Sequence, residues 1–260
     1  MKLTFLGTGT SFGIPIIGCD CRVCRSPDPR DKRTRVGAVV ESASGARILI
    51  DTPPELRLQL VHARIDRVDA VFFTHDHADH IHGIDDIRAM TVRQGEALPM
   101  YAEPEVLRRL SHRFPYIFDR TMRPLPGTSK PEGEGRPIGD GDHVQVGDLD
   151  VEAIALPHGV MRVLAYRVGA LGYVTDAKAI PDAARARLRG VKVLVLNALF
   201  RRPHPTHLSI GEAVEVAADI GAERTYLLHL THETSHAELE AELPAGVEPA
   251  YDGLVVEVDD

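Results

Sequence analysis

The sequence lacks any run of about 18 apolar residues, the length that a helix needs to cross the hydrocarbon core of a bilayer. We therefore expect no membrane span and no membrane partner. A signal-peptide pattern is also missing, because the chain begins directly with a strand-like segment over residues 2–6. These two absences lead us to expect a cytoplasmic protein.

An excess of basic residues is absent as well. Lysine and arginine number 30 against 38 aspartates and glutamates, and the formal net charge is -8. A general nucleic-acid binder would carry a basic footprint, so this balance disfavours nucleic acid as a partner and leaves room for no more than a local basic patch.

Cysteine is scarce, with three residues that all lie between positions 19 and 24. An odd and closely spaced set makes a poor disulfide framework. Thiolates that are kept for a metal fit a reducing compartment better, so we read the three cysteines as metal ligands.

The chain shows no obvious internal repeat and no linker, so we expect a single domain over residues 1–260. Segments rich in β-branched and aromatic residues predict strands at 3–6, 38–41, 47–50, 70–73, 100–101, 151–155, 164–167, 172–174, 193–196, 225–228 and 254–258. Helices are predicted at 55–63, 84–93, 103–113, 183–188 and 210–220, the last with a capping box of Ser209 and Glu212. The order predicts mixed sheets covered by helices on the outside, an α/β layered fold. Residues 123–142, rich in proline and glycine, predict a long loop.

The densest group of potential metal ligands is HDHADH at positions 75–80, directly after the apolar segment 68–74 that predicts a buried strand. His75 and His77 would project on the same side of an extended backbone, because side chains alternate along a strand. Asp79 and His80 follow where the chain begins to turn. Such a cluster suits two metal ions side by side, and a solvated histidine-rich loop is the simpler alternative.

Three more donors follow predicted strands, namely His158, Asp176 and His229. Each alone is explained as a satisfied polar group, a turn former or a helix cap. Together with the four donors at 75–80 they make seven nitrogen and oxygen ligands, which suits two divalent ions bridged by a carboxylate and a water. Donors of this kind accept zinc, manganese or iron, and we expect zinc or manganese.

With these residues in this order, the chain resembles the metallo-β-lactamase superfamily. The resemblance implies a four-layer αβ/βα sandwich of two mixed sheets, with the metals at one edge. It also implies one metal on His75, His77 and His158, a second on Asp79, His80 and His229, and a bridging Asp176. Asp51, at the end of a predicted strand, matches an acidic family position, and we expect it to orient a ligand histidine.

The segment CDCRVC at 19–24 is a CxCxxC motif, which suits a tetrahedral zinc that needs one further ligand. That ligand should be a histidine, and His232 and His236 are the candidates. His232 lies three residues past His229, so it would place this loop beside the metal edge.

CxCxxC together with HLTH at 229–232 makes the chain similar to the phosphoribosyl cyclic phosphodiesterase group. The resemblance implies a structural zinc on Cys19, Cys21, Cys24 and His232, and it allows a homodimer. It also places His207 at a catalytic position, with a surface polar residue before a helix cap as the alternative. Asp79 is both a ligand and a catalytic candidate. Arg30, Arg33 and Arg35 form a possible phosphate-steering patch or simply a solvated face.

These features predict a phosphodiesterase that cleaves a small cyclic or nucleotide-like phosphodiester. Two metals would activate a bridging water as hydroxide and clamp the phosphate oxygens, while His207 would donate to the leaving oxygen. The alternatives are a tRNA 3′-processing endonuclease, a thioester or β-lactam hydrolase, and a cofactor-biosynthesis protein that keeps the CxCxxC loop.

Overall fold

Strand β3 (Arg47–Ile50) illustrates why the fold is layered. Ile48 and Ile50 pack into the core between two sheets, whereas Leu49 on the opposite face packs beneath helices. A strand that is apolar on both faces must be covered on both sides, so the sequence requires helices outside each sheet.

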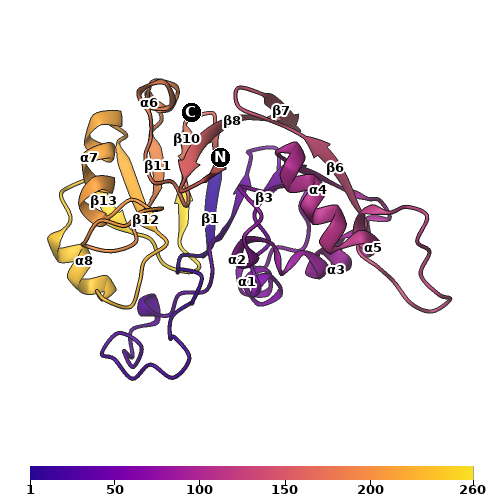
Figure 1. The fold of residues 1–260 in the computed structure, drawn as a ribbon, viewed down its shortest axis with the longest axis horizontal. Coiled ribbons are helices and arrows are strands. Elements are labelled where there is room, and N and C mark those ends of the chain that lie inside the picture. Colours follow the sequence, from indigo (N-terminus) through magenta and orange to yellow (C-terminus); the bar gives the residue numbers. More distant parts are fainter. Residues whose placement is uncertain (260) are drawn as a thin grey trace.

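The structure is a computed structural model that describes residues 1–259, and it contains two seven-stranded mixed sheets (Figure 1). The first sheet has the order β14-β1-β2-β3-β4-β5-β6, and the second has the order β13-β12-β11-β10-β9-β8-β7. The strands of the first sheet are β1 (Lys2–Gly7), β2 (Gly37–Glu41), β3, β4 (Ala70–Phe72), β5 (Leu98–Ala102), β6 (Gly133–Pro137) and β14 (Val255–Glu257). Those of the second are β7 (His143–Val146), β8 (Leu149–His158), β9 (Met161–Val168), β10 (Leu171–Tyr173), β11 (Val193–Asn197), β12 (Arg224–Leu228) and β13 (Val247–Pro249).

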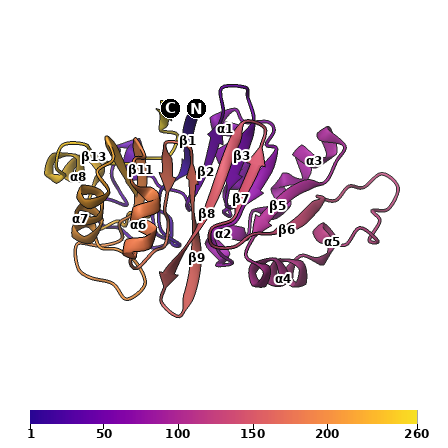
Figure 2. The same cartoon turned by 90° about the horizontal axis from the view of Figure 1, so that it is seen from above.

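Helices cover the outer face of each sheet, so the expected four-layer αβ/βα sandwich is confirmed (Figure 2). Over the first sheet lie α1 (Leu56–Ala63), α3 (Arg88–Gln94), α4 (Pro104–Arg113) and α5 (Pro115–Phe118). Over the second lie α6 (Asp182–Leu188), α7 (Ile210–Ile220) and α8 (His236–Glu242). The short helix α2 (Ala78–Ile81) is part of HDHADH, and two 3-10 turns occupy Pro29–Asp31 and Ile84–Ile87. Within residues 1–259, no helix combines the length and the apolar character that crossing a bilayer requires.

Each predicted strand and helix overlaps an observed strand or helix. The Ser209–Glu212 capping box is present at the start of α7. The predicted loop at 123–142 is wrong in part, because residues 133–137 form β6 and pair in parallel with β5. This edge strand is held by backbone hydrogen bonds and exposes most of its side chains. A Cβ at Gly133 would lie 2.7 Å from the Met100 sulfur, so the glycine permits the close approach.

Candidate metal centre and active site

The strand ends gather the predicted ligands at one edge of the sandwich. His75 and His77 follow β4, His158 ends β8, Asp176 follows β10 and His229 follows β12. Strands β3 to β6 run parallel, and so do β10 to β13, so the loops after their carboxyl ends meet at a common edge. The edge is thus built by topology from residues up to about 150 positions apart in the chain.

The donor atoms form two groups that match the ligand sets implied by the family resemblance. His75, His77 and His158 form one group, and Asp79, His80 and His229 form the other, with donor atoms in each group within 4.8 Å of one another. The same spacing joins His75 and His80 to Asp176, and a further group joins His158 and Asp176 to His207. Asp176 therefore lies between the two triads.

Two buried ring nitrogens of the candidate ligands have no protein partner of their own among residues 1–259. The buried Nε2 of His80 and Nδ1 of His229 have no hydrogen-bond partner in the described structure. His80 Nε2 lies 3.5 Å from carboxylate oxygens of both Asp79 and Asp176, and His75 Nε2 lies 2.9 Å from His77 Nδ1. An unpaired buried nitrogen is costly, and a cation beside His80 Nε2 would remove that cost, so the donor set fits divalent metal ions.

The backbone is strained where the cluster is assembled. Asp51, Asp176 and His229 have φ angles of 62°, 56° and 59°, and Arg64 is the one other non-glycine residue among 1–259 with positive φ. Such conformations persist only where the surrounding structure enforces them, and they gather at functional sites. Their concentration at this edge supports a functional role for it.

Hydrogen bonds behind the cluster fix the orientation of its imidazoles. Asp51 is fully buried and its Oδ2 lies 2.7 Å from His80 Nδ1, as expected for a residue that orients a ligand histidine. Thr74 donates to Asp51 from its backbone N–H and its hydroxyl, both at 2.8 Å. His158 Nδ1 lies 3.0 Å from the carbonyl oxygen of Thr206. In each case a proton on Nδ1 leaves the Nε2 lone pair for the cluster.

The pKa shifts also suit a metal centre. Burial lowers the pKa of His75, His77 and His158, so these rings are neutral near pH 7 and offer lone pairs. Burial opposes the charged form of Asp176, but His229 and His80 outweigh it and hold the pKa of Asp176 well below its usual value. Burial opposes the charged form of His80 as well, but Asp176, Asp51 and Asp79 outweigh it and raise the pKa of His80 well above its usual value. The cluster therefore combines three neutral imidazoles with a buried ion pair between Asp176 and His80.

Two supporting residues escaped the sequence-based prediction. Asp76, inside HDHADH, is buried and points away from the cluster, where it forms ion pairs with Arg109 at 3.2 Å and Arg113 at 2.9 Å on α4. Asn197 ends β11, accepts from the backbone N–H of Ala177 at 2.9 Å and donates to its carbonyl oxygen at 3.1 Å. In extended backbone, Asp76 must point away from the side that His75 and His77 share, and this alternation could have indicated its separate role. A polar residue at the end of the apolar run VLVLN was the signal for Asn197.

The cysteine loop forms a second cluster. The sulfur atoms of Cys19, Cys21 and Cys24 lie 3.3, 3.4 and 3.5 Å from His232 Nδ1. Tetrahedral zinc with Zn–S bonds of about 2.3 Å and a Zn–N bond of about 2.05 Å would separate the same atoms by about 3.6 Å. The measured distances fit that geometry. The backbone N–H of Cys24, which donates to the Cys21 sulfur, lowers the pKa of Cys21 to about 6 and so favours the thiolate.

His236, the other candidate for the fourth ligand, lies outside this cluster. It is buried, its backbone N–H donates to Asp31 at 2.7 Å, and its Nδ1 lies 3.3 Å from an Arg33 guanidinium nitrogen. Arg33 is itself only 1% exposed and donates to Thr8 Oγ1 at 3.0 Å and to the carbonyl oxygen of Ala250. The interpretation of Arg33 as part of a solvated basic face is therefore wrong, because it holds buried loops together.

The other two arginines of that suggested patch are paired with carboxylates. Arg30 lies 2.9 Å from Asp28 and 3.4 Å from Glu240, and Arg35 pairs with Glu55. The three arginines do not form a common basic surface at the metal edge.

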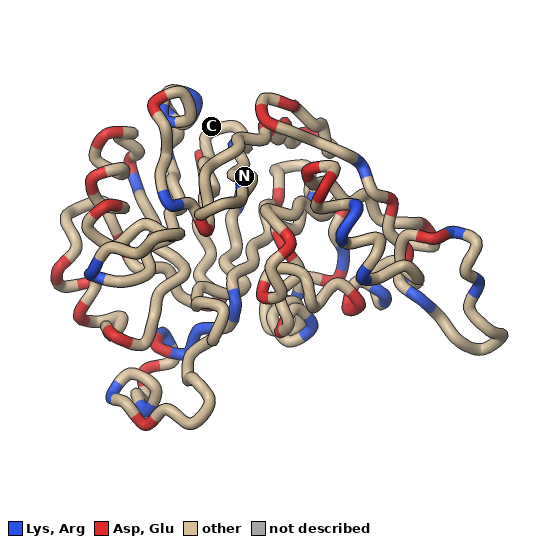
Figure 3. Tube along the Cα trace, in the orientation of Figure 1, with Lys and Arg blue, Asp and Glu red and all other residues tan. Residues whose placement is uncertain are grey.

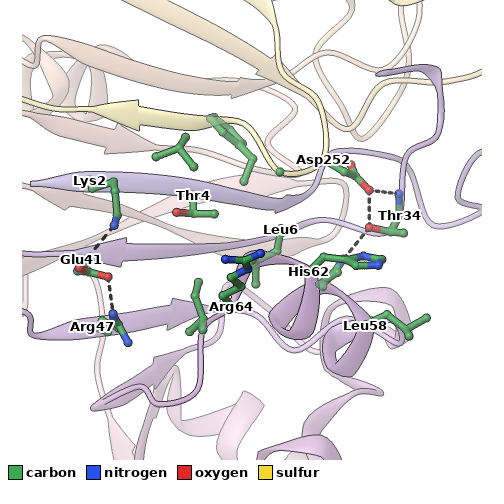
Figure 4. A pocket seen from close by; sticks show the side chains of 16 residues that line it. Lys2, Thr4, Leu6, Thr34, Glu41, Arg47, Leu58, His62, Arg64 and Asp252 are labelled. Atoms are coloured by element: carbon green, nitrogen blue, oxygen red, sulfur yellow. Dashed lines mark hydrogen bonds and ion pairs between the residues drawn. The ribbon is translucent and has the colours of Figure 1, made fainter. Parts of the chain in front are cut away.

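A cavity of about 590 Å³ lies away from this edge, against the first sheet and α1 (Figure 4). Lys2 and Arg47 line it, and each pairs with Glu41, at 3.5 and 2.6 Å. None of the residues that line it belongs to a donor group of the metal clusters. We therefore place the chemistry at the HDHADH edge.

Comparison with known proteins finds a family match that includes every candidate ligand of this edge. The family described as "Beta-lactamase superfamily domain" matches residues 46–230. The fold is similar to the crystal structure of a diphosphatase from the PhnP family, with a TM-score of 0.90 and 38% sequence identity. The match covers 98% of this chain and 96% of that one.

Two curated relatives differ in how much of their length is matched. An octanoyltransferase of Porphyromonas gingivalis is 39% identical over 265 residues. This match covers 100% of this chain and 52% of that protein. The chain thus spans about half the length of this relative. A ribonuclease Z of Methanopyrus kandleri is 27% identical, and the match covers 99% of this chain and 98% of that protein.

We predict that Cys21→Ser lowers the metal content of the purified protein from three equivalents per chain to two, because the tetrahedral thiolate set loses a ligand. Plasma mass spectrometry measures the zinc content. His236→Asn is the matched control and should keep three equivalents. Equal zinc in Cys21→Ser and the parent protein would contradict the assignment of the cysteine cluster.

We also predict that Asp51→Asn weakens metal binding at the edge about 10- to 100-fold, because His80 loses the carboxylate that orients it. Titration against a chromophoric chelator measures this affinity. Asp150→Asn removes a carboxylate 3.0 Å from the surface histidine His143 and should leave the affinity unchanged. Equal affinities for Asp51→Asn and the parent would show that Asp51 does not orient a ligand.

Proposed function

We propose that this chain, which belongs to the β-lactamase superfamily and stands close to its PhnP group, is a phosphodiesterase with two metal ions at the HDHADH edge. Its substrate would be a small cyclic or nucleotide-like phosphodiester. The observation that carries the proposal is the pair of donor triads with the buried Asp176 between them. Family membership supports a metal-dependent hydrolase, and the two-metal count and the ester are our inference.

The donor triads determine what each side chain contributes. Two divalent ions on these donors would supply positive charge for the phosphate oxygens and lower the pKa of water. Asp176 can serve both triads, because its carboxylate groups with His75 of one triad and His80 of the other, with donor atoms within 4.8 Å of one another. Asp79 has a side chain that is 15% exposed, so this ligand candidate stands at the open side of the cluster.

His207 is placed to act on the leaving group. Its Nε2 lies 3.0 Å from the Oδ2 of Asp176, and its Nδ1 lies 2.8 Å from the hydroxyl of Thr206. The side chain is 12% exposed, so it lies at the rim of the buried donors. A ring N–H at this position would donate to the oxygen that departs as the phosphorus–oxygen bond breaks. This geometry supports the predicted catalytic role over a surface polar residue.

The charge distribution favours a small substrate over a transfer RNA. Lysines and arginines are interspersed with aspartates and glutamates over the whole fold (Figure 3), and the net charge is -8. Arginines near the metal edge are committed to carboxylates, as Arg109 and Arg113 are to Asp76. A protein that grips RNA through many phosphates needs unpaired basic side chains. The resemblance to a ribonuclease Z keeps RNA cleavage as the alternative to be tested.

Acyl transfer, the activity named for the Porphyromonas relative, has less support in this chain. The relative is about twice as long, and its name describes the whole protein. An acyl-enzyme intermediate held as a thioester requires a free cysteine thiol. The three cysteines of this chain all contact His232 in the second cluster.

We predict that the purified protein hydrolyses bis(p-nitrophenyl) phosphate when manganese or zinc is added, and that His77→Ala abolishes the activity because one triad loses a ligand. Release of p-nitrophenol measures the rate. His112→Ala, on the exposed side of α4, is the control and should keep the parent rate. Undiminished activity in His77→Ala would exclude the metal assignment.

His207→Ala should lower kcat by about 10²- to 10⁴-fold, the usual effect of losing a positioned proton donor. Metal content should stay at the parent level, because each triad is complete without His207. Steady-state kinetics and metal analysis of the same preparation separate the two effects. If activity and metal content fell together, His207 would be a ligand and not a donor to the leaving group.

A further inference from the structure

A second pocket opens onto the metal edge between two loops. It has a volume of about 360 Å³, within the range of about 300–1,000 Å³ that small-molecule sites occupy. Phe12 and Ile16 of the N-terminal loop line one wall, and Leu199 and Phe200 after β11 line the other. His207 and His229 also line it, so the pocket adjoins the proposed reaction site.

The chemistry of this pocket differs from that of the metal edge. None of the eleven described residues that line it is an aspartate, glutamate, lysine or arginine. A phosphate would therefore find its charge partners at the metal cluster and not in this pocket. The pocket suits the uncharged part of a substrate whose phosphate lies at the cluster.

Aromatic rings run from this pocket to the cluster. Phe200 and His204 have ring centroids 5.8 Å apart, His204 and His207 are 5.3 Å apart, and His207 and His229 are 4.6 Å apart. The guanidinium of Arg202 lies 4.0 Å from the centre of the Phe200 ring and so helps to hold that ring in place.

On the other wall, Phe12 is 70% exposed, an unusual position for a large apolar ring. The turn that carries it is closed by two hydrogen bonds to Thr10, from the Phe12 N–H at 3.3 Å and the Gly13 N–H at 2.9 Å. The cysteine cluster supports the same wall, because the Ile16 N–H donates to the Cys24 sulfur at 3.4 Å and His232 lines the pocket. The wall is therefore built and anchored.

We propose that this pocket binds a flat, uncharged aromatic ring of the substrate, namely a nucleobase that packs against Phe12 and Phe200. The inference rests on the proposed phosphodiesterase function and narrows its substrate to phosphodiesters of nucleosides, in preference to alkyl esters or esters of a sugar without a base. Phe12 and Phe200 are then the residues that set specificity. Base–aromatic stacking tolerates every base, so this pocket would select nucleosides as a class.

Two esters with the same leaving group test this assignment, thymidine 5′-(p-nitrophenyl phosphate) and methyl p-nitrophenyl phosphate. In the metal-loaded parent protein, kcat/KM should be about tenfold higher for the thymidine ester, the scale of one stacking contact. Phe12→Ala should bring the ratio of the two values close to one, and Phe12→Tyr should retain it. Leu125→Ala is the control, because Leu125 is 75% exposed and lies outside the pocket.

The outcomes separate the pocket from the reaction. Hydrolysis of both esters with a ratio near one in the parent, or an equal loss on both esters in Phe12→Ala, would overturn the nucleobase pocket and leave the phosphodiesterase function standing. Hydrolysis of neither ester would overturn the function.

In that case, calorimetric titration of the metal-loaded protein with thymidine 5′-phosphate and with inorganic phosphate tests the pocket alone. The nucleotide should bind about tenfold more tightly than phosphate, and Phe12→Ala should remove that difference; equal binding in the parent would overturn the pocket.

Discussion

A buried carboxylate shared between two groups of imidazoles is the constraint on which the rest of the site depends. Asp176 is 2% exposed and lies within 3.5 Å of ring nitrogens of His80, His207 and His229. A buried carboxylate stays ionised only when opposite charge or hydrogen-bond donors surround it. The triads on either side of Asp176 meet that condition, and they do so most simply with divalent ions between them. The positive φ angles of Asp51, Asp176 and His229 are the strain that this assembly has to hold in place.

The two sheets make this possible because they are rigid and because their strand ends meet. Phe72 stacks on Tyr101 at 4.7 Å and packs edge-on against Tyr166 at 5.4 Å in the core between the sheets. The Tyr166 hydroxyl donates at 2.6 Å to the carbonyl oxygen of Phe73, two residues before the HDHADH segment begins. The cysteine cluster extends the same logic to the N-terminal loop, which it ties to His232 beside the edge. A structural zinc there would therefore shape the wall of a substrate pocket as well as stabilise a loop.

The sequence was most informative where the chemistry is local. HDHADH and CxCxxC bring their donors together within six residues, so spacing alone indicated both clusters. The ends of predicted strands singled out His158, Asp176 and His229, and the resemblance then assigned them to two metals. The fold and family that the resemblance implied are confirmed. Arg33 was misread because its burial depends on loops from opposite ends of the chain. Strand β6 was missed because its exposed side chains carry no apolar pattern. The pocket at Phe12 and Phe200 could not be predicted either, because it joins residues nearly 190 positions apart.

Anomalous X-ray diffraction from crystals grown with zinc tests the central claim most directly. The account predicts two peaks about 3.5–4 Å apart on either side of Asp176, and a third peak among Cys19, Cys21, Cys24 and His232. A peak at the cysteine cluster alone, with no peak at either of the two triads beside Asp176, would contradict the account.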